Sequence, residues 1–483
     1  MISVERQDSF HLKISRVLQE ETAHRLDLFL FVPGELGLTG QVIAEEAFYH
    51  AAIHVKRTYF SDRYRLPLVL SRLAERGRLD PEHYRLSLSL YAYQYVVAME
   101  RSTQPLREAA REARKADNAG REDERKGTGR DGDEAASLAS RLQEHADLAV
   151  GILRRLRRQE PAEESLRRHY ATVDNYLSWF TEQRLLALVA SLPRGRLREV
   201  RQRLLAICRA EGEYREAREY NSARVTRDPT RMSNKMRLLR RLIEYPVTLK
   251  QRTQELGGAE QKAVKGLATA VVMVFVSLGL LEARNVLADI TALLVLTMAL
   301  LYALREVFKD DLRNTLWRLL RKGRPKWRRQ YLDPTRNLTV GRQLEWFDYK
   351  RFSRLDEEIK RVRKRNVAQR EEVVLHYRSS SRMSPTRFLS GYDHTRETLS
   401  LDLSPIARLM DKGSHRVYRL EEGDQVVREE VEKRHLLNLV IREVQGERPP
   451  TLQRWKIVMS RSRIVDLERV HAEGPGHEAG SDP

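Results

Sequence analysis

The feature that most constrains this chain is a pair of short apolar runs that follow each other almost without a break. The first covers Gly266–Leu281, the second covers Val286–Leu304, and four residues separate them. As an α-helix the first run spans about 24 Å, or about 28 Å if the helix begins at Ala263. The second run also spans about 28 Å. Both lengths approach the hydrocarbon core of a bilayer, which is roughly 30 Å thick.

Two successive segments that are apolar on every face are rare in the core of a soluble protein. We therefore predict a two-helix transmembrane hairpin over residues 263–304, with a buried hairpin inside a soluble domain as the alternative. The charged N-terminus has no apolar core of a signal peptide. Gly266 and Ala270 are small residues four apart, which favours close packing between membrane helices.

The distribution of basic residues around the two runs predicts their orientation. Lysine and arginine gather on the cytoplasmic side of membrane helices. Here they flank the hairpin on both outer sides, whereas the short connection holds only Arg284. We expect a multi-pass protein of a bacterial inner (cytoplasmic) membrane with both termini in the cytoplasm. The bacterial assignment rests on the richness in Arg and Ala.

A strongly basic segment follows the second run. Residues 305–330 contain ten Lys or Arg against three acids, in a chain whose formal net charge is +20. Such clusters next to a membrane helix attract anionic lipids, and tryptophan prefers the same interface. Nucleic acid is the alternative partner of a basic chain, but lipid contact explains the position of the cluster more economically. The predicted lipid-binding residues are Trp317, Arg318, Arg321, Lys322, Arg324, Lys326, Trp327, Arg328 and Arg329.

The rest of the pattern predicts a multi-domain α+β membrane protein with a helix-rich N-terminal half. Residues 1–104 combine two strand-like runs with two helix-like ones. Residues 105–137 have few large apolar side chains, which predicts a charged flexible linker, with a frayed helix that ends in a disordered loop as the alternative. Residues 138–262 repeat apolar positions at three and four, which predicts helices.

The C-terminal part changes to a period of two. Residues 305–369 are expected to form the basic juxtamembrane segment and a charged helix. Residues 370–467 alternate apolar and polar side chains, which predicts a β-rich cytoplasmic domain. We expect a hairpin turn at 421–424 and a disordered tail at 468–483.

One set of side chains has the spacing of a metal site. Glu46, His50 and His54 are four apart and would share one face of a continuous helix, where they could bind a divalent cation. Alternatively, the two histidines only line a helix packed against neighbouring aromatic residues. The single cysteine, Cys208, excludes an intramolecular disulfide and is expected to be a small buried apolar residue.

Asp289 is the only acid within the two apolar runs. An acid inside a membrane is a functional candidate by default, although a position one turn from the start of the helix also fits a solvated helix end.

Motifs of known chemistry do not stand out. There is no phosphate loop and no kinase, hydrolase or deaminase signature, so we expect no cofactor and favour binding over catalysis. The predicted function is a membrane-anchored scaffold, sensor or regulatory protein that binds anionic lipids and a cytoplasmic protein partner. The alternatives are a membrane-tethered enzyme with an unrecognised metal site and a homo-oligomeric channel or transporter component, since two helices alone line no pore.

Overall fold

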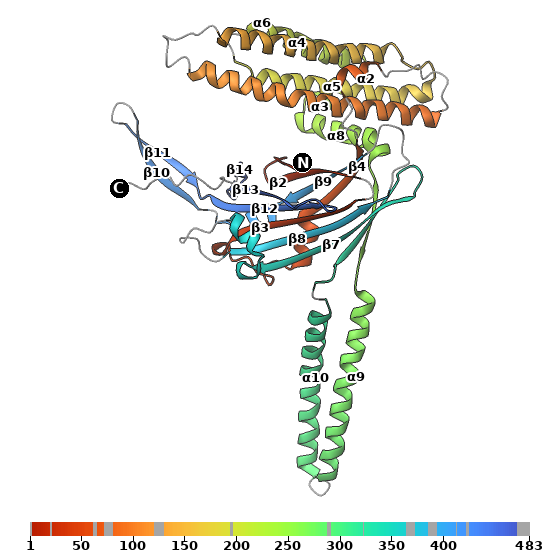
Figure 1. Cartoon of the computed structure of the whole chain (residues 1–483), viewed down its shortest axis with the longest axis vertical. Coiled ribbons are helices and arrows are strands. Elements are labelled where there is room, and N and C mark those ends of the chain that lie inside the picture. Colours follow the sequence, from red (N-terminus) through yellow and green to blue (C-terminus); the bar gives the residue numbers. More distant parts are fainter. Residues whose placement is uncertain are drawn as a thin grey trace.

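The chain forms a mixed α+β structure with a helix-rich region, a β-rich region and a pair of long helices (Figure 1). In this view the helical bundle lies above the sheets and the two long helices extend below them. The predicted combination of helix-rich and β-rich parts is confirmed. The computed structural model describes residues 2–19, 22–60, 65–71, 81–119, 130–193, 197–286, 291–321, 323–363, 372–384, 394–411, 413–421 and 425–470.

Two antiparallel sheets make up most of the β-rich region. The smaller sheet has the strand order β1-β2-β9-β4, and the larger has the order β14-β13-β12-β3-β8-β7-β6-β5. The strands of the smaller sheet are β1 (Ser3–Arg6), β2 (His11–Leu18), β9 (His394–Asp402) and β4 (Ile53–Phe60). Those of the larger sheet are β14 (Ile464–Val470), β13 (Thr451–Met459), β12 (His435–Gln445), β3 (Ala23–Pro33), β8 (Glu372–Met383), β7 (Thr339–Arg351), β6 (Trp327–Leu332) and β5 (Lys250–Glu255).

The two sheets share a hydrophobic core. Ile14 of β2 and Leu28 of β3 belong to one cluster of buried side chains. Buried and partly exposed residues alternate along β2, as expected for a strand with one face on the core. β3 is buried on both faces, because Phe31 lies in a second cluster that includes Ile359 of α11 (Glu357–Arg363). This explains the nearly continuous apolar sequence of β3.

Both ends of the chain contribute to the same sheets. β3 pairs with β8 and β12, and β9 pairs with β2 and β4. The strands of the predicted regions 1–104 and 370–467 therefore pair with each other in the same sheets. The two regions do not form separate β domains. The period-two pattern marks each strand, but it carries no information about which distant strand becomes its partner.

A two-stranded ribbon extends from the β-rich region (Figure 1). It consists of β10 (Ser414–Glu421) and β11 (Gln425–Glu432), and Glu421 lies opposite Gln425. The predicted turn at 421–424 falls mainly on residues 422–424, which lie outside the described residues. The short helix α12 (Ser404–Ala407) has Pro405 in its first turn.

The helical bundle packs against one end of the sheets. Tyr59 and Phe60 of β4 belong to the bundle's hydrophobic cluster. Local capping helps to begin α8, where the Asp228 side chain accepts hydrogen bonds from the backbone N–H groups of Thr230 and Arg231. The helices of this region are α2 (Leu66–Ser71), α3 (Pro81–Ala119), α4 (Arg130–Arg157), α5 (Glu164–Ser191), α6 (Arg198–Ala217), α7 (Ala223–Thr226) and α8 (Pro229–Glu244).

The described parts of the segment 105–137 are helical, which differs from the predicted flexible linker and agrees with the helical alternative. α3 continues through Ala119, and α4 begins at Arg130. Leu106 and Ala110 are buried in the bundle core, at 5 % and 0 % exposure. Alanine, arginine and glutamate are strong helix formers, and the buried side chains one turn apart attach this charged helix to the bundle. Residues 120–129 lie outside the described part.

Two further elements differ from the sequence prediction. The continuous helix expected to carry Glu46, His50 and His54 is limited to α1 (Glu45–Ala52), because the following residues form β4 and pair with β9. The segment 305–369 contains β6 and β7 in addition to helix. Both strands are held by pairing within the larger sheet, which charge and local pattern did not reveal.

Candidate membrane-binding site

Two long helices form a hairpin that protrudes from the body of the protein (Figure 1). α9 (Gly258–Val286) and α10 (Thr291–Arg321) lie side by side. α9 follows β5, and α10 precedes β6, the strand paired with β5. The hairpin is therefore an insertion between two neighbouring strands. The start of α9 and the end of α10, which are its inner ends, both lie at the same edge of the larger sheet.

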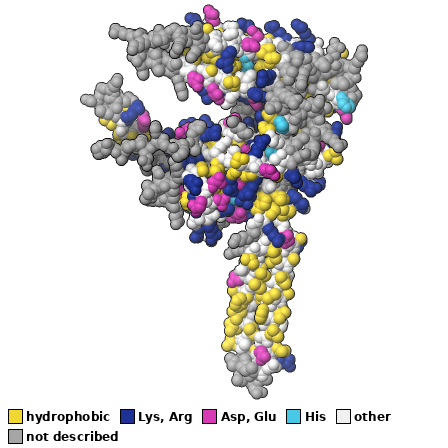
Figure 2. Space-filling model, viewed as in Figure 1, with side chains coloured by type: hydrophobic (Ala, Val, Ile, Leu, Met, Phe, Trp, Pro, Cys, Tyr) yellow, Lys and Arg dark blue, Asp and Glu magenta, His cyan; other side chains and the backbone are white. Residues whose placement is uncertain are grey.

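The surface of this hairpin is largely apolar. In the described part of the chain, 17 of the 26 exposed large apolar side chains lie on α9 and α10. Phe275 and Leu296, for example, are 70 % and 66 % exposed. Figure 2 shows apolar side chains covering the hairpin, whereas charged side chains are frequent on the body. A surface of this size marks a site of contact with an apolar partner or a membrane.

Within the described residues, one helix is long and apolar enough to cross a membrane. It covers Gly258–Asn285, and 17 % of its most apolar stretch is buried. This finding covers the first of the two helices predicted to span the membrane. Asp289, the predicted intramembrane acid, lies outside the described residues.

The contact between α9 and α10 uses a different stripe from the predicted one. Ala268, Val272 and Val276, each four residues apart, are 0 %, 7 % and 9 % exposed. The predicted small residues Gly266 and Ala270 instead face outward. In an α-helix, positions two residues apart lie on nearly opposite faces. Gly266 and Ala270 each lie two residues from the buried Ala268, so they are on the exposed face.

A glycine shapes the junction between the body and the hairpin. Gly257 has φ +97°, and a Cβ atom there would lie 3.0 Å from Arg321 Nη1 and 3.1 Å from the Trp317 ring. The Leu256 N–H donates to the Lys326 carbonyl at 2.9 Å. The Arg324 guanidinium lies 3.1 Å from Glu260. The two inner ends of the hairpin are thus joined to each other as well as to the sheet.

Part of the predicted basic cluster lies at this junction. The Arg321 guanidinium stacks 5.1 Å from the Trp317 ring centre, and the Arg324 side chain is 53 % exposed. Arg328 donates to the Gln254 side chain on β5 at 3.2 Å. Lys322 and the side chain of Arg318 lie outside the described part.

The other part of the cluster is not at the surface, which corrects the lipid-binding prediction. Trp327 is 2 % exposed and stacks on Tyr49 with ring centres 3.6 Å apart. Arg329 is 8 % exposed and lies 3.1 Å from Glu345. Lys326 is mostly buried and binds Glu45 at 2.6 Å. β6 begins at Trp327, and its pairing carries these residues into the sheet interior.

The predicted metal set is also corrected. Glu46 and His50 lie on α1, but this helix ends at Ala52, so His54 lies on β4. His54 Nε2 lies 3.1 Å from the Ala51 carbonyl oxygen, and His50 packs edge-on against Trp327. No group of three metal-binding side chains occurs in the described part of the chain.

Cys208 is 5 % exposed and packs within the bundle core, as its sequence context suggested. Burial raises the pKa of its thiol to about 11, with a smaller contribution from Glu182. The thiol is therefore protonated at neutral pH, which removes it as a nucleophile.

Sequence reasoning missed a network of buried charges between the two sheets. Glu397 accepts hydrogen bonds from Arg16 Nε at 2.7 Å and Arg57 Nε at 2.9 Å. Burial opposes the ionisation of Glu397, but Arg16 and Arg57 outweigh it and lower the pKa of this carboxyl to about 2. Gln343 extends the network, because it donates to Glu345 at 2.7 Å and also accepts from Arg57.

This network joins the smaller sheet to β6 and β7 of the larger sheet. A signal for it is present in β2, where Arg16 occupies the buried side of the alternation that also holds Leu12, Ile14 and Leu18. A charged residue at such a position requires an opposite charge in the core.

A polar cleft of about 630 Å³ separates the smaller sheet from α3. Five basic side chains line it together with three glutamates, and Glu100 binds Arg184 at 2.9 Å. The basic residues are Lys13, Arg16, Arg101, Arg184 and Arg396. The small excess of positive charge suits an anion more than a cation.

Comparison with protein-family models, with curated proteins and with solved structures finds no match for this chain.

Proposed function

We propose that this protein is a membrane-anchored scaffold, whose hairpin inserts into the cytoplasmic membrane and holds the β-rich region and the helical bundle at the cytoplasmic surface. The observation that carries the proposal is the apolar surface of α9 and α10. Phe275 and Leu278 on α9 are 70 % and 57 % exposed, a degree of exposure that water disfavours and lipid accepts.

The dimensions of the hairpin support insertion of both helices. α9 has 29 residues and α10 has 31, which correspond to about 44 Å and about 46 Å. Each exceeds the roughly 30 Å core of a bilayer. Because both inner ends join the same sheet edge, we propose that the chain crosses twice and keeps both termini on one side.

The scaffold role rests on the ribbon β10–β11. Val417, Tyr418 and Val426 on this ribbon are 49 %, 65 % and 65 % exposed. Tyr418 and Val426 share one face of the ribbon, because Val426 pairs with Leu420, and Val417 lies on the other face. An isolated two-stranded ribbon gains little stability from its own contacts, so these exposed apolar side chains suit a protein partner.

Membrane fractionation after an alkaline carbonate wash tests the anchoring. We expect the full chain to stay in the membrane fraction and the double variant Phe275→Lys/Leu278→Lys to be partly released. A lysine near the centre of a membrane helix costs roughly 2.5–3.5 kcal/mol. The matched control is Leu238→Lys/Leu242→Lys on α8, whose side chains are 56 % and 50 % exposed on the body.

A wild-type chain that washes off the membrane and forms a soluble oligomer would overturn the proposal, since the hairpins would then cover each other. Topology is tested in a Cys208→Ser background with single cysteines Arg284→Cys at the hairpin tip and Glu468→Cys on β14. A membrane-impermeant maleimide added to spheroplasts should label only the first. Labelling of both, or of the second alone, contradicts the proposed orientation.

A further inference from the structure

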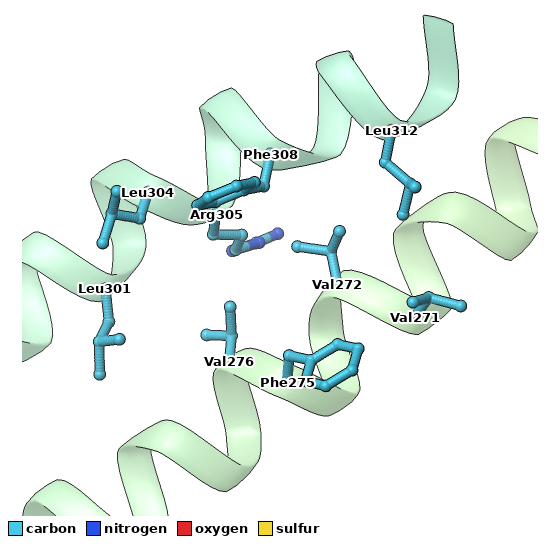
Figure 3. A pocket seen from close by; sticks show the side chains of 9 residues that line it. All are labelled: Val271, Val272, Phe275, Val276, Leu301, Leu304, Arg305, Phe308 and Leu312. Carbon is cyan, nitrogen blue, oxygen red and sulfur yellow. The ribbon is translucent and has the colours of Figure 1, made fainter. Parts of the chain in front are cut away.

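The hairpin contains an apolar groove of about 450 Å³ between its two helices (Figure 3). α9 contributes Val272 and Val276 to its wall, and α10 contributes Leu301 and Phe308. The groove extends from Leu301 to Leu312, which is about 16 Å along α10.

One charged side chain enters this apolar surface. Figure 3 shows Arg305 pointing from α10 toward α9, between Phe308 and the valines of the facing helix. Its Nε atom is buried and has no hydrogen-bond acceptor. The nearest acids along α10 are engaged elsewhere, because Glu306 binds Lys309 at 2.5 Å and Asp310 lies 3.7 Å from Arg313.

The Arg305 guanidinium is partly buried and lies 5.7 Å from the ring centre of Tyr302, a contact that leaves its buried Nε–H without an acceptor. This Nε–H is one of five N–H donors of the group, and a buried donor without an acceptor is unfavourable, more so when the group is charged. Arginine and phosphate form paired, charge-assisted hydrogen bonds, so a phosphate oxygen satisfies several of these donors at once. The apolar walls at the same time suit a hydrocarbon chain.

We propose that this groove binds one anionic phospholipid, with its phosphate at Arg305 and an acyl chain along the valine, leucine and phenylalanine walls. The inference rests on the proposed membrane insertion of the hairpin. Arg305 is the first charged residue after the second apolar run and lies about 21 Å from Thr291, the first described residue of α10. This places it toward the body side of the membrane, where a headgroup is within reach of a long side chain.

The test uses the full chain reconstituted in vesicles that contain equal amounts of phosphatidylglycerol and phosphatidylcholine. After extraction in a mild detergent, native mass spectrometry counts the lipids that remain bound. We expect wild type to retain phosphatidylglycerol in preference to phosphatidylcholine. Arg305→Ala should lower this preference by about fivefold, the factor equivalent to about 1 kcal/mol for one basic residue near anionic lipid.

A second variant tests the part of the groove that holds the acyl chain, and a third serves as a control. Val272→Phe adds volume inside the groove and keeps Arg305, so it should reduce the retention of both lipids. Arg313→Ala is the matched control, because Arg313 lies two turns further along α10 and has Asp310 as its partner. It should behave as wild type.

Flotation of each protein with its vesicles distinguishes this inference from the proposed function. A wild type that fails to float overturns both. Normal flotation combined with unchanged lipid retention in Arg305→Ala and Val272→Phe overturns the groove site alone. Loss of a dimer in Arg305→Ala without any change in bound lipid would also overturn it, because a second copy of the chain would then be the occupant.

Discussion

Arg57 on β4 donates a hydrogen bond of 2.9 Å from Nε to Glu397 on β9, and the two side chains are 0 % and 2 % exposed. Arg16 of β2 shares the same carboxylate. The charge pair therefore fixes three strands of the smaller sheet from inside the core.

Removal of the shared carboxylate charge is expected to destabilise the fold strongly. Glu397→Gln leaves Arg16 and Arg57 buried without their main counter-charge, which should lower the free energy of unfolding by about 3–5 kcal/mol. A urea titration of the detergent-solubilised chain measures this. Glu5→Gln is the control, because Glu5 is 53 % exposed and lies 3.8 Å from Lys13; its change should stay below about 1 kcal/mol. Equal effects of the two variants would contradict the assigned role.

The same carboxyl should make the fold sensitive to acid. The pKa of Glu397 is lowered from its ordinary value of 4.5 to about 2 in the folded protein. Its contribution to stability is thus complete above pH 4.5 and is lost as the pH falls toward 2, because the unfolded chain binds the proton first. Unfolding midpoints across this range should fall less in Glu397→Gln than in wild type. Parallel curves would show that other groups cause the acid sensitivity.

A buried histidine is expected to weaken the bundle at mildly acidic pH. His145 on α4 is 5 % exposed, and burial lowers the pKa of its imidazole from 6.5 to about 4. Between these two pH values only the unfolded chain gains a proton, so the bundle should lose stability by up to about 3 kcal/mol. Helical circular dichroism during thermal unfolding at pH 7 and pH 5 measures the effect. His145→Gln should show a smaller difference between the two conditions, and an unchanged difference would exclude His145 as its source.

The junction glycine is expected to resist substitution. Gly257→Ala places a side chain at φ +97° and against Arg321 and Trp317, which should cost about 1–3 kcal/mol. Gly266→Ala provides the matched control on α9, since no atom lies within 4 Å of its Cβ position, and alanine favours the helix by up to about 1 kcal/mol. The midpoints of thermal unfolding in detergent should therefore move in opposite directions. A shift of both in the same direction would argue against strain at the junction.

Two arginines of the basic cluster, one buried and one exposed, are expected to contribute differently to the free energy of unfolding. Arg329→Ala leaves Glu345 buried without its charged partner, and the loss of stability should be about 3–5 kcal/mol. Arg324→Ala removes a half-exposed side chain paired with an equally exposed Glu260, so its effect on unfolding should be below about 1 kcal/mol. Urea titrations of both variants measure the difference. Comparable losses of stability in the two variants would indicate that Arg329 is exposed, as the sequence alone had suggested.

Several features followed from local sequence because they depend on neighbours a few residues apart. The alternation in His11–Leu18 marked a half-buried strand, and the apolar run from Gly266 marked a long uncovered helix. Local sequence did not reveal that Lys326 and Trp327 of the basic cluster are buried, whereas earlier residues of the cluster are exposed. Their burial depends on α1 and β7, which are far away in the sequence.

The sequence by itself determined that the chain combines helix-rich and β-rich parts and carries an apolar segment that its own fold does not cover, because periodicity and hydropathy are properties of neighbouring residues. Only the tertiary structure decided that strands from both ends of the chain pair within the same two sheets, that His54 leaves the helix of His50, and that Arg16 contacts Glu397. These contacts bring together residues widely separated along the chain, and their free energy comes from strand pairing and from charges that must find each other once they are removed from water.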